Sequence, residues 1–329
     1  MSKKNIALLA GGNSGEAEIS FKSALIIEQN IDESLYNVYK INLHKNEWQY
    51  TDAEGNLLQI DKNDFSLTLN TGKINFHCVF IAIHGTPGED GMLQGYFELL
   101  NIPYTTCDHT TSAITFNKAY CNKIVQAAGV NISNSIHLFK NQAFSIQQIL
   151  NEITLPCFVK PNNGGSSIGM TKVGQDAELE AAIQKAFRED HQVLIEEFIE
   201  GRELSCGMIY ANDKMLVFPI TEIISENEYF DYEAKYQGKS KEITPAVLDE
   251  AITIKVKSTA VYLYNKLNCK GIVRFDFILK TNTEDLYFLE VNTVPGQSAE
   301  SIVPQQIRAM GLSIMEVYTM LIEESMKKG

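Results

Sequence analysis

The run Gly271-Ile-Val-Arg-Phe-Asp-Phe-Ile-Leu279 is followed by a polar turn, Lys280-Thr-Asn-Thr-Glu-Asp285, and then by Leu286-Tyr-Phe-Leu-Glu-Val-Asn292. Both runs are rich in β-branched and aromatic residues, which predicts two strands of one hairpin. Because side chains alternate between the faces of a strand, each run exposes a polar set on one face. We expect Arg274, Asp276 and Ile278 to share a face of the first strand. On the second strand, we expect Phe288, Glu290 and Asn292 to share a face.

The simplest register of this hairpin places Asp276 opposite Glu290, and Arg274 opposite Asn292. Like charges directly opposite each other destabilise a strand pair, so stability alone does not explain the two carboxylates. A divalent cation between them would explain them, because Mg2+ takes oxygen ligands and is usually held by one or two carboxylates plus substrate phosphates. The hairpin therefore predicts a magnesium-nucleotide site near the C-terminus.

Length and composition narrow the class of protein. The 329 residues can form two or three domains with cores of their own. The net charge of −13 argues against a broad nucleic-acid surface. The six cysteines are scattered without a CxxC pair, which is typical of reduced thiols in a cytosolic protein. No stretch approaches the roughly 20 apolar residues that span a bilayer. We therefore expect a cytoplasmic enzyme with neither a nucleic-acid nor a membrane partner.

The first third of the chain alternates predicted strands and helices. Apolar runs at 5–10 and 78–83 predict strands, and helical periodicity follows each of them. This alternation predicts a parallel sheet that binds ligands at the carboxyl ends of its strands. His84 lies at such an end, although a histidine satisfied within its own loop explains it equally well.

A glycine-rich loop, Lys160-Pro-Asn-Asn-Gly-Gly-Ser-Ser-Ile-Gly-Met170, follows a third apolar run. Small residues let backbone N–H groups approach phosphates, and Lys160 supplies positive charge. Met170 stands where a P-loop needs lysine, and the loop leads to another strand rather than to a helix. A phosphate-covering loop of another design and a plain hairpin loop both remain open.

Three further segments admit a functional and a structural interpretation. The acidic linker that follows 193–195 has two interpretations. Either its backbone groups bind adenine and Glu203 binds a ribose, or the linker is a solvated turn. Glu18 binds a substrate ammonium, or complements a helix dipole. The run 292–304 also has two interpretations. Either Gly296 directs an N–H group to an oxyanion and Ser301 binds a carboxylate, or the run is only a Pro/Gly turn. The polar stretch 222–245, with its aromatic residues, indicates a lid.

Taken in this order, the motifs resemble the ATP-grasp superfamily and, within it, the D-alanine–D-alanine ligase family. The resemblance spans nearly the whole chain. It rests on HGTPGEDGMLQG (84–95), VKPNNGGSSIGM (159–170), YFDYEAKY (229–236), RFDF (274–277) and EVNTVPG (290–296). It implies an α/β ATP-grasp fold in which central and C-terminal α+β domains sandwich ATP beside an N-terminal Rossmann-like parallel-sheet domain. We place these domains at 107–195, 196–329 and 1–106.

The implied reaction uses ATP to phosphorylate one D-alanine, and the amine of a second D-alanine then displaces phosphate. The product serves peptidoglycan synthesis. The resemblance implies two Mg2+ ions, which Mn2+ could replace, and a homodimer. The implied metal ligands are Asp276, Glu290 and Asn292. The implied ATP-binding residues are Lys118, Lys160, Ser166, Glu196, Glu197, Ile199, Glu203 and Lys235.

The resemblance also implies roles toward the substrates. Glu18 would bind the first ammonium, with His84 near the first carboxylate, and Glu18 would form a hydrogen-bonded trio with Ser166 and Tyr236 that latches the lid. Arg274 and the N–H group of Gly296 would stabilise the acyl phosphate and the tetrahedral intermediate. Ser301 would bind the second carboxylate. Closure of the lid would exclude water from the acyl phosphate.

The sequence departs from the family near the second substrate. Gln297, Ser298 and Glu300 replace the Met-Thr and histidine that many relatives carry. Tyr236 favours D-alanine over a hydroxy acid as the second substrate. A ligase that joins D-alanine to D-lactate or to another amino acid, and a catalytically silent nucleotide-binding regulator, are the alternatives. A nicotinamide dehydrogenase is disfavoured because GxGxxG is missing.

Overall fold

The structure is a computed structural model that describes residues 2–225 and 240–327. Its N-terminal sheet has the strand order β6-β5-β4-β3-β2-β1-β7. Only β2, β1 and β7 pair in parallel, as predicted, and an antiparallel extension that we did not predict continues from β2. The strands are β1 (Lys4–Gly11), β2 (Tyr36–His44), β3 (Glu47–Thr51), β4 (Leu57–Asp61), β5 (Ser66–Leu69), β6 (Gly72–Ile74) and β7 (Cys78–Ile81).

A smaller sheet of four antiparallel strands forms the central region, in the order β11-β10-β12-β9. Its apolar face packs on α6 (Asp176–Glu189) and α5 (Ile146–Glu152) around Val159, Ile183 and Ile195. The glycine-rich loop joins β10 to β11, so it connects two strands, as predicted. The strands are β9 (Ser135–Phe139), β10 (Cys157–Pro161), β11 (Thr171–Val173) and β12 (Gln192–Glu197).

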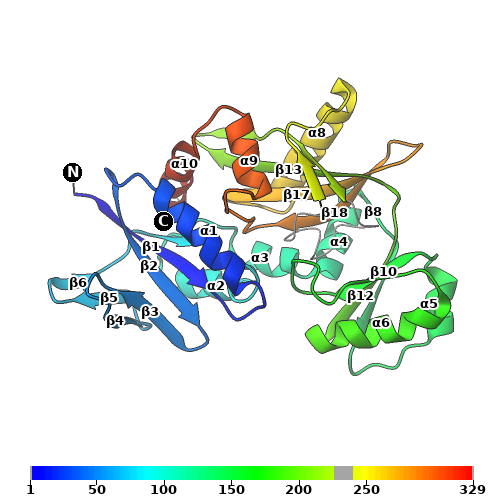
Figure 1. Cartoon of the computed structure of the whole chain (residues 1–329), viewed down its shortest axis with the longest axis horizontal. Helices are drawn as coiled ribbons and strands as arrows, with labels where there is room; N and C mark the ends of the chain where they lie inside the picture. Colours follow the sequence, from blue (N-terminus) through cyan, green and yellow to red (C-terminus); the bar gives the residue numbers. More distant parts are fainter. Residues whose placement is uncertain (1, 226–239, 328–329) are drawn as a thin grey trace.

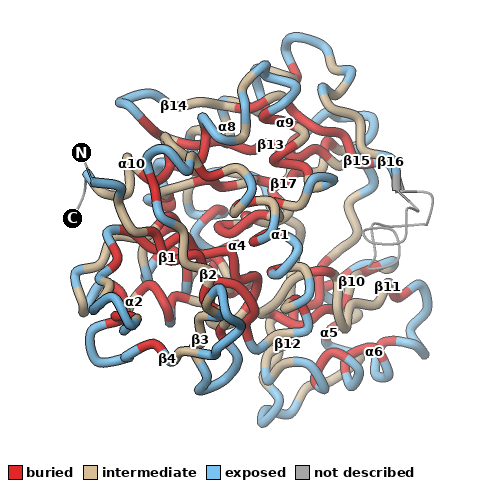
Figure 2. The backbone as a smooth tube through the Cα atoms, turned by 60° about the vertical axis from the view of Figure 1, so that its left-hand side comes forward, coloured by how far each residue is buried: buried red, intermediate tan, exposed pale blue. Residues whose placement is uncertain are grey.

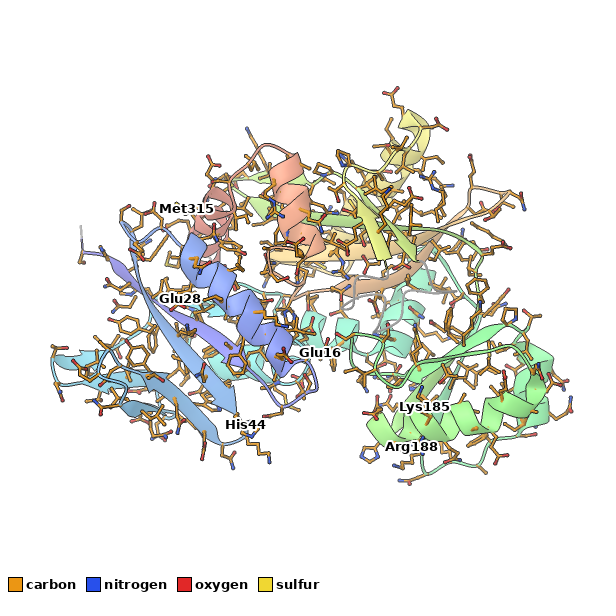
Figure 3. All side chains as sticks on the ribbon, viewed as in Figure 1. Glu16, Glu28, His44, Lys185, Arg188 and Met315 are labelled. Carbon is orange, nitrogen blue, oxygen red and sulfur yellow. The ribbon has the colours of Figure 1, made fainter. Side chains whose placement is uncertain are left out.

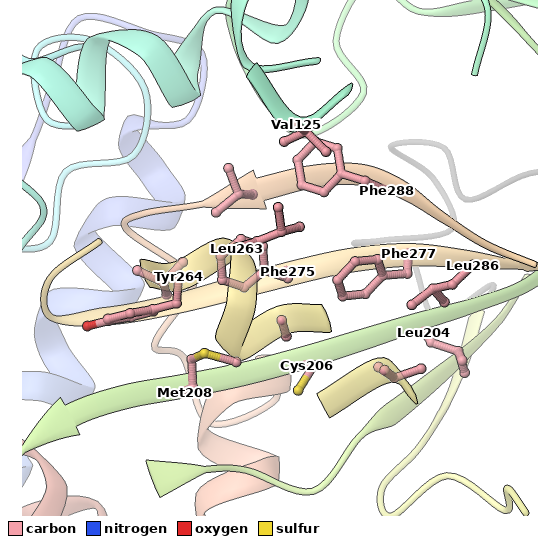
Figure 4. Close-up of a cluster of buried hydrophobic side chains, with 14 of the residues drawn as sticks. Val125, Leu204, Cys206, Met208, Leu263, Tyr264, Phe275, Phe277, Leu286 and Phe288 are labelled. Atoms are coloured by element: carbon pink, nitrogen blue, oxygen red, sulfur yellow. The ribbon is translucent and has the colours of Figure 1, made fainter. Parts of the chain in front are cut away.

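The third sheet follows the order β16-β15-β13-β17-β18-β8, with β14 paired to β13. One face packs on α8 (Glu250–Lys266), and Figure 4 shows Leu263 and Tyr264 among the aromatic and aliphatic side chains of this core. The strands are β8 (Asn131–Ile132), β13 (Gly201–Ala211), β14 (Lys214–Val217), β15 (Thr221–Ser225), β16 (Ser240–Ile243), β17 (Ile272–Lys280) and β18 (Leu286–Asn292).

The remaining helices connect the sheets. In Figure 1, α1 (Ala17–Asn30) lies beside α10 (Ile314–Met326). There α10 and α9 (Ile302–Ala309) pack against Ile6 and Phe80 of the N-terminal sheet. Helices α3 (His109–Phe116) and α4 (Lys118–Ala127) contact β18 of the third sheet, and α2 (Met92–Leu99) contacts α3. Figure 2 shows buried backbone running through all three sheets. In the described part of the chain, no helix is long and apolar enough to cross a membrane.

The division into domains at 106/107 and 195/196 remains a prediction. The sheets follow it broadly, since their strands occupy 4–81, 135–197 and 201–292 apart from β8. Packing crosses the divisions, because Cys121 and Val125 of α4 join the core of the third sheet. The six cysteines are free and buried.

The hairpin register is confirmed: Asp276 lies opposite Glu290, and Arg274 lies opposite Asn292. The predicted face of Phe288 is wrong. A β-bulge after Asp276 pairs Phe277 with Phe288, and the two rings meet edge to face in the core. The extra residue in β18 reverses the alternation, so Phe288 does not share a face with Glu290.

Candidate functional site

A cleft of about 530 Å³ lies between the central sheet and the third sheet. Residues from the glycine-rich loop, β12, β13, β17 and β18 line it, together with the start of α4. Most of the predicted nucleotide and metal residues meet there: Lys118, Lys160, Ser166, Glu196, Glu197, Ile199, Glu203, Arg274, Asp276 and Glu290. The fold therefore brings together side chains that lie up to 172 positions apart in the sequence.

Asp276 is the most strongly held carboxylate of the cleft floor. It is 3% exposed and accepts hydrogen bonds from Arg274, Ser205 and Asn292. The Arg274 Nη2 atom lies 2.7 Å from Asp276 Oδ2. Burial alone would lower the pKa of Arg274, but the charge of Asp276 outweighs burial and raises it. Arg274 therefore stays a fixed positive charge beside the metal-ligand candidates.

Glu290, the neighbour of Asp276 across the hairpin, pairs with a lysine from another element. The Lys118 Nζ atom at the start of α4 lies 3.3 Å from Glu290 Oε2 and donates to the carbonyl of Gly164 at 2.8 Å. Burial opposes the charged form of Lys118, but Glu290 nearby leaves its pKa raised. Lys118 thus joins the glycine-rich loop to the carboxylate strand.

A second lysine lies at the other side of the loop. Lys160, at the end of β10, forms an ion pair with Glu196 of β12, and both side chains are at least nine-tenths buried. Asn122 of α4 donates to the other oxygen of Glu196 at 2.8 Å. Both lysines therefore already neutralise acids of the cleft, and both lie where phosphate groups could approach.

The structure corrects the predicted contact between Glu18 and Ser166. Glu18 lies in the first turn of α1 with 82% of its side chain exposed, and it pairs with Lys22. The hydroxyl of Ser166 donates instead to Glu16, which is 7% exposed. Helix α1 begins at Ala17, so Glu16 precedes it and points toward the loop, as Figure 3 shows at the lower end of α1.

His84 is buried behind the cleft rather than on its wall. Its Nε2 atom lies 3.0 Å from Ser23 Oγ, and its Nδ1 atom lies 2.9 Å from the carbonyl of Val294. Burial lowers the pKa of His84, so the ring is held neutral. This position fixes the loop after β18 to α1, so two other elements satisfy the ring rather than its own loop, and its role near the first carboxylate stays a prediction.

Gly296 and Ser301 lie together at the start of α9. A Cβ atom on Gly296 would come within 2.8 Å of Ser301 Oγ, so only glycine lets the backbone pass this close. Ser301 precedes the helix without capping it through its side chain, and its hydroxyl lies 2.7 Å from that of Ser298. The two hydroxyls therefore lie next to the first turn of α9, whose N–H groups favour an anionic ligand. Neither Gly296 nor Ser301 lines the 530 Å³ cleft.

Two kinds of functional residue were missed from the sequence. Ser205 bonds Asp276 from the next strand, a contact that only the strand order reveals. Phe158, Met170 and Ile278 give the cleft an apolar wall suited to a flat base. For Phe158 and Ile278, the alternation of their strands was the available signal. Lys235, Tyr236 and the rest of 226–239 lie outside the described residues, whereas 222–225 and 240–243 of the predicted lid at 222–245 belong to the strands β15 and β16.

The residues proposed for magnesium suit an oxygen-preferring cation. Asp276 and Glu290 are adjacent across the hairpin, and Asn292 donates to Asp276 at 3.0 Å. Within 2–225 and 240–327, no group of three His, Cys, Asp or Glu residues gathers as a metal centre. A cation here would rely on two carboxylates, an amide oxygen and the ligand's own phosphates, which is how proteins commonly hold Mg2+.

This fold, with a cleft between an antiparallel sheet and a mixed sheet and a glycine-rich loop beside two lysines, defines an ATP-grasp ligase. The models of the D-ala D-ala ligase N-terminus and C-terminus match residues 5–107 and 124–323. D-alanine–D-alanine ligases of Flavobacterium johnsoniae and Bacteroides fragilis are each 46% identical over 98% of this chain and 99% of the relative. The chain therefore belongs to the D-alanine–D-alanine ligase family, whose members are ATP-dependent enzymes of peptidoglycan synthesis.

Solved structures agree with this assignment. The D-alanine–D-alanine ligase of Coxiella burnetii superposes with a TM-score of 0.88 at 28% identity, covering 100% of this chain and 95% of that one. A D-Ala:D-Ser ligase of Enterococcus faecalis gives 0.87 at 33% identity, covering 98% and 100%. The Bacillus anthracis D-alanine–D-alanine ligase complexed with ATP gives 0.79 at 26% identity, covering 99% and 98%.

Proposed function

We propose that the chain joins two D-alanine molecules in an ATP-dependent reaction that passes through D-alanyl phosphate and supplies D-alanyl-D-alanine for peptidoglycan. The observation that carries this proposal is the floor of the cleft. Asp276, Glu290 and Arg274 share one face of the hairpin beneath the glycine-rich loop, in a chain 46% identical to D-alanine–D-alanine ligases.

The chemistry requires activation of a carboxylate. An oxygen of the first D-alanine attacks the terminal phosphorus of ATP, the bond to ADP breaks, and an acyl phosphate forms. The amine of the second D-alanine then attacks the acyl carbon, and the C–O bond breaks with its electron pair leaving on phosphate. Phosphoryl transfer depends mostly on positioning and on charge neutralisation. Lys118, Lys160 and Arg274 supply three positive charges around one cleft.

For the nucleotide, we assign Lys118, Lys160 and the loop at Ser166 to the phosphates, and the apolar wall to the adenine. The linker residues Glu196, Glu197 and Ile199 border the adenine end of the cleft, and Glu203 suits the ribose. Asp276, Glu290 and Asn292 would hold Mg2+, or Mn2+ in its place. The cation would offset the charge of the phosphates and polarise them.

For the first D-alanine, Glu16 takes the role that the sequence assigned to Glu18, since Glu16 is buried against the glycine-rich loop. Arg274 and the N–H group of Gly296 would stabilise the developing charge of the acyl group. Ser301 and the first turn of α9 suit the carboxylate of the second D-alanine. His84 would support the first-carboxylate site by fixing its loop. Lys235 and Tyr236 keep their proposed lid roles, outside the described residues.

Two further properties rest on the family resemblance and stay proposals: a homodimer, and a cytoplasmic location. The second-substrate alternative also stays testable, because one structural relative is a D-Ala:D-Ser ligase. Phosphate release should be measured with ATP and Mg2+ against D-alanine, L-alanine, and D-alanine with D-serine or D-lactate. We expect D-alanine alone to support turnover and L-alanine to be inert. If phosphate is released only when D-alanine and D-lactate are both present, the chain is a D-alanine–D-lactate ligase and the proposal is wrong.

A further inference from the structure

An acidic side chain outside the predicted site lies on the same face of the third sheet as the cleft floor. Glu242 of β16 pairs with Ile223 of β15, Ile223 pairs with Glu203 of β13, and Glu203 pairs with Ile278 of β17. Directly paired residues point to the same face of a sheet. Ile223, Glu203 and Ile278 all line the cleft, so the Glu242 side chain belongs to that face as well.

Helix α9 fixes Glu242 through Gln305, a side chain one helical turn after Ser301. The Gln305 Nε2 atom donates to Glu242 Oε2 at 2.5 Å and to the carbonyl of Glu300 at 2.8 Å. The Gln305 N–H group also bonds the carbonyl of Ser301 at 3.2 Å. One glutamine therefore connects Glu242 to the first turn of α9.

The charges around Glu242 leave it able to accept a cation. In the described ranges, no lysine or arginine forms an ion pair with it, since Arg274 is engaged by Asp276. Burial is the main cause that raises its pKa, and Glu300 adds to the rise, while Arg274 and the Gln305 hydrogen bond oppose it. Lys241, next to it on β16, is exposed. A partly buried carboxylate without an ion pair in the described ranges is stabilised by a cation that reaches it.

We propose that Glu242 binds the ammonium group of the second amino acid while the first turn of α9 binds its carboxylate, so that Glu242 selects an amino acid over a hydroxy acid. This inference rests on the proposed function and concerns the same site. The second substrate carries an ammonium group and a carboxylate group on the same carbon atom. Glu242 and the α9 N-terminus offer the matching pair of charges on either side of Gln305. D-Lactate has no ammonium group and gains nothing from Glu242.

The test separates the two half-reactions. Hydroxylamine traps the acyl phosphate as a hydroxamate and needs no second amino acid, so it reports the first step alone. Dipeptide formation reports both steps. In Glu242→Gln, the side chain still accepts the Gln305 hydrogen bond but loses its charge. We expect its KM for the second D-alanine to rise about 10- to 100-fold, the range set by a lost charge-assisted hydrogen bond. Hydroxamate formation and D-lactate ligation should stay within about twofold of the wild type.

Two further variants complete the test. Glu242→Asp keeps the charge and should recover a large part of the lost affinity, which a merely structural role would not predict. Glu250→Gln, an exposed acid at the start of α8, is the matched control and should behave as wild type. An equal fall in hydroxamate and dipeptide, or an unchanged KM in Glu242→Gln, would overturn the proposal. Wild-type protein that yields neither product would instead sink the proposed function itself.

Discussion

The hydroxyl of Ser166 donates a hydrogen bond to the carboxylate of Glu16, which ties the glycine-rich loop to the start of α1. The two residues lie 150 positions apart, one in the loop between β10 and β11 and the other just before α1. A Cβ atom added to Gly165 would come within 2.9 Å of the same carboxylate, so the loop passes close to Glu16. Glu16 thus contacts the loop directly, and we propose that it also binds the first substrate.

The first prediction compares the two acids of this segment. Glu16→Gln should lower kcat/KM for D-alanine by about 10- to 100-fold, because a charge-assisted hydrogen bond is lost. Glu18→Gln removes only an exposed ion pair with Lys22, worth about 0.3–0.5 kcal/mol, and should change kcat/KM less than twofold. Steady-state kinetics on both variants measures these two changes in kcat/KM. A larger loss in Glu18→Gln than in Glu16→Gln would restore the assignment made from the sequence.

The reason why the sequence misplaced this contact is local. Both acids precede an amphipathic run, and the run alone does not reveal that α1 begins at Ala17. The residue at which the helix begins decides whether an acidic side chain points back to the glycine-rich loop or outward from the first helical turn. The face of Phe288 was misplaced for a related reason, because a β-bulge adds a residue without leaving a mark in the composition.

Other parts of the site followed from the sequence. Alternation and a short turn were enough to pair Asp276 with Glu290, and glycine density located the loop at 160–170. The pairing of Lys118 with Glu290 could not be predicted from local pattern, since it depends on how α4 packs against β18. Glu242 was not predicted as a site residue, because strand pairing across β16, β15, β13 and β17 determines the face of the sheet on which its side chain lies.

The second prediction separates catalysis from stability on the hairpin. Glu290→Gln should cut turnover by about 10²–10³-fold, the loss typical of removing one transition-state stabiliser. Its free energy of unfolding should fall less than that of Asp276→Asn, because the Glu290 side chain is 24% exposed and lies 3.3 Å from Lys118, whereas Asp276 is 4% exposed and lies 2.7 Å from Arg274. Asp276→Asn should also destabilise the protein, by about 3–5 kcal/mol, because it leaves the buried Arg274 charge unpaired. Turnover assays and chemical denaturation on both variants test this contrast; equal stability losses would refute it.

The third prediction concerns ligand-linked stability and does not depend on turnover. A Mg2+ complex of a non-hydrolysable ATP analogue at 100 times its Kd should stabilise the fold by about 2.7 kcal/mol. A rise in Tm of several degrees is expected by calorimetry, and the rise should be smaller with the nucleotide alone. In Glu290→Gln, the difference made by Mg2+ should shrink. A Tm that responds to neither nucleotide nor metal would contradict the assigned cleft.

The fourth prediction follows from Glu89, which accepts a hydrogen bond from Gly85 at 2.7 Å near Glu16. Burial, and then the charge of Glu16, raise the pKa of Glu89 from 4.5 to about 8. Between those pH values the folded state holds a proton that the unfolded state has lost, so this group destabilises the fold as the pH rises. Glu89→Gln should remove that decline. Denaturation curves from pH 5 to 8 test it; a steeper decline in the variant would contradict the sign.

The most direct test of the central claim is the identity of the product. Purified protein incubated with ATP, Mg2+ and D-alanine should form D-alanyl-D-alanine, with one ADP and one phosphate per dipeptide, as mass spectrometry and phosphate release would show. L-Alanine should give no dipeptide. ATP hydrolysis without any dipeptide, or no reaction of D-alanine at saturating ATP, would contradict the account.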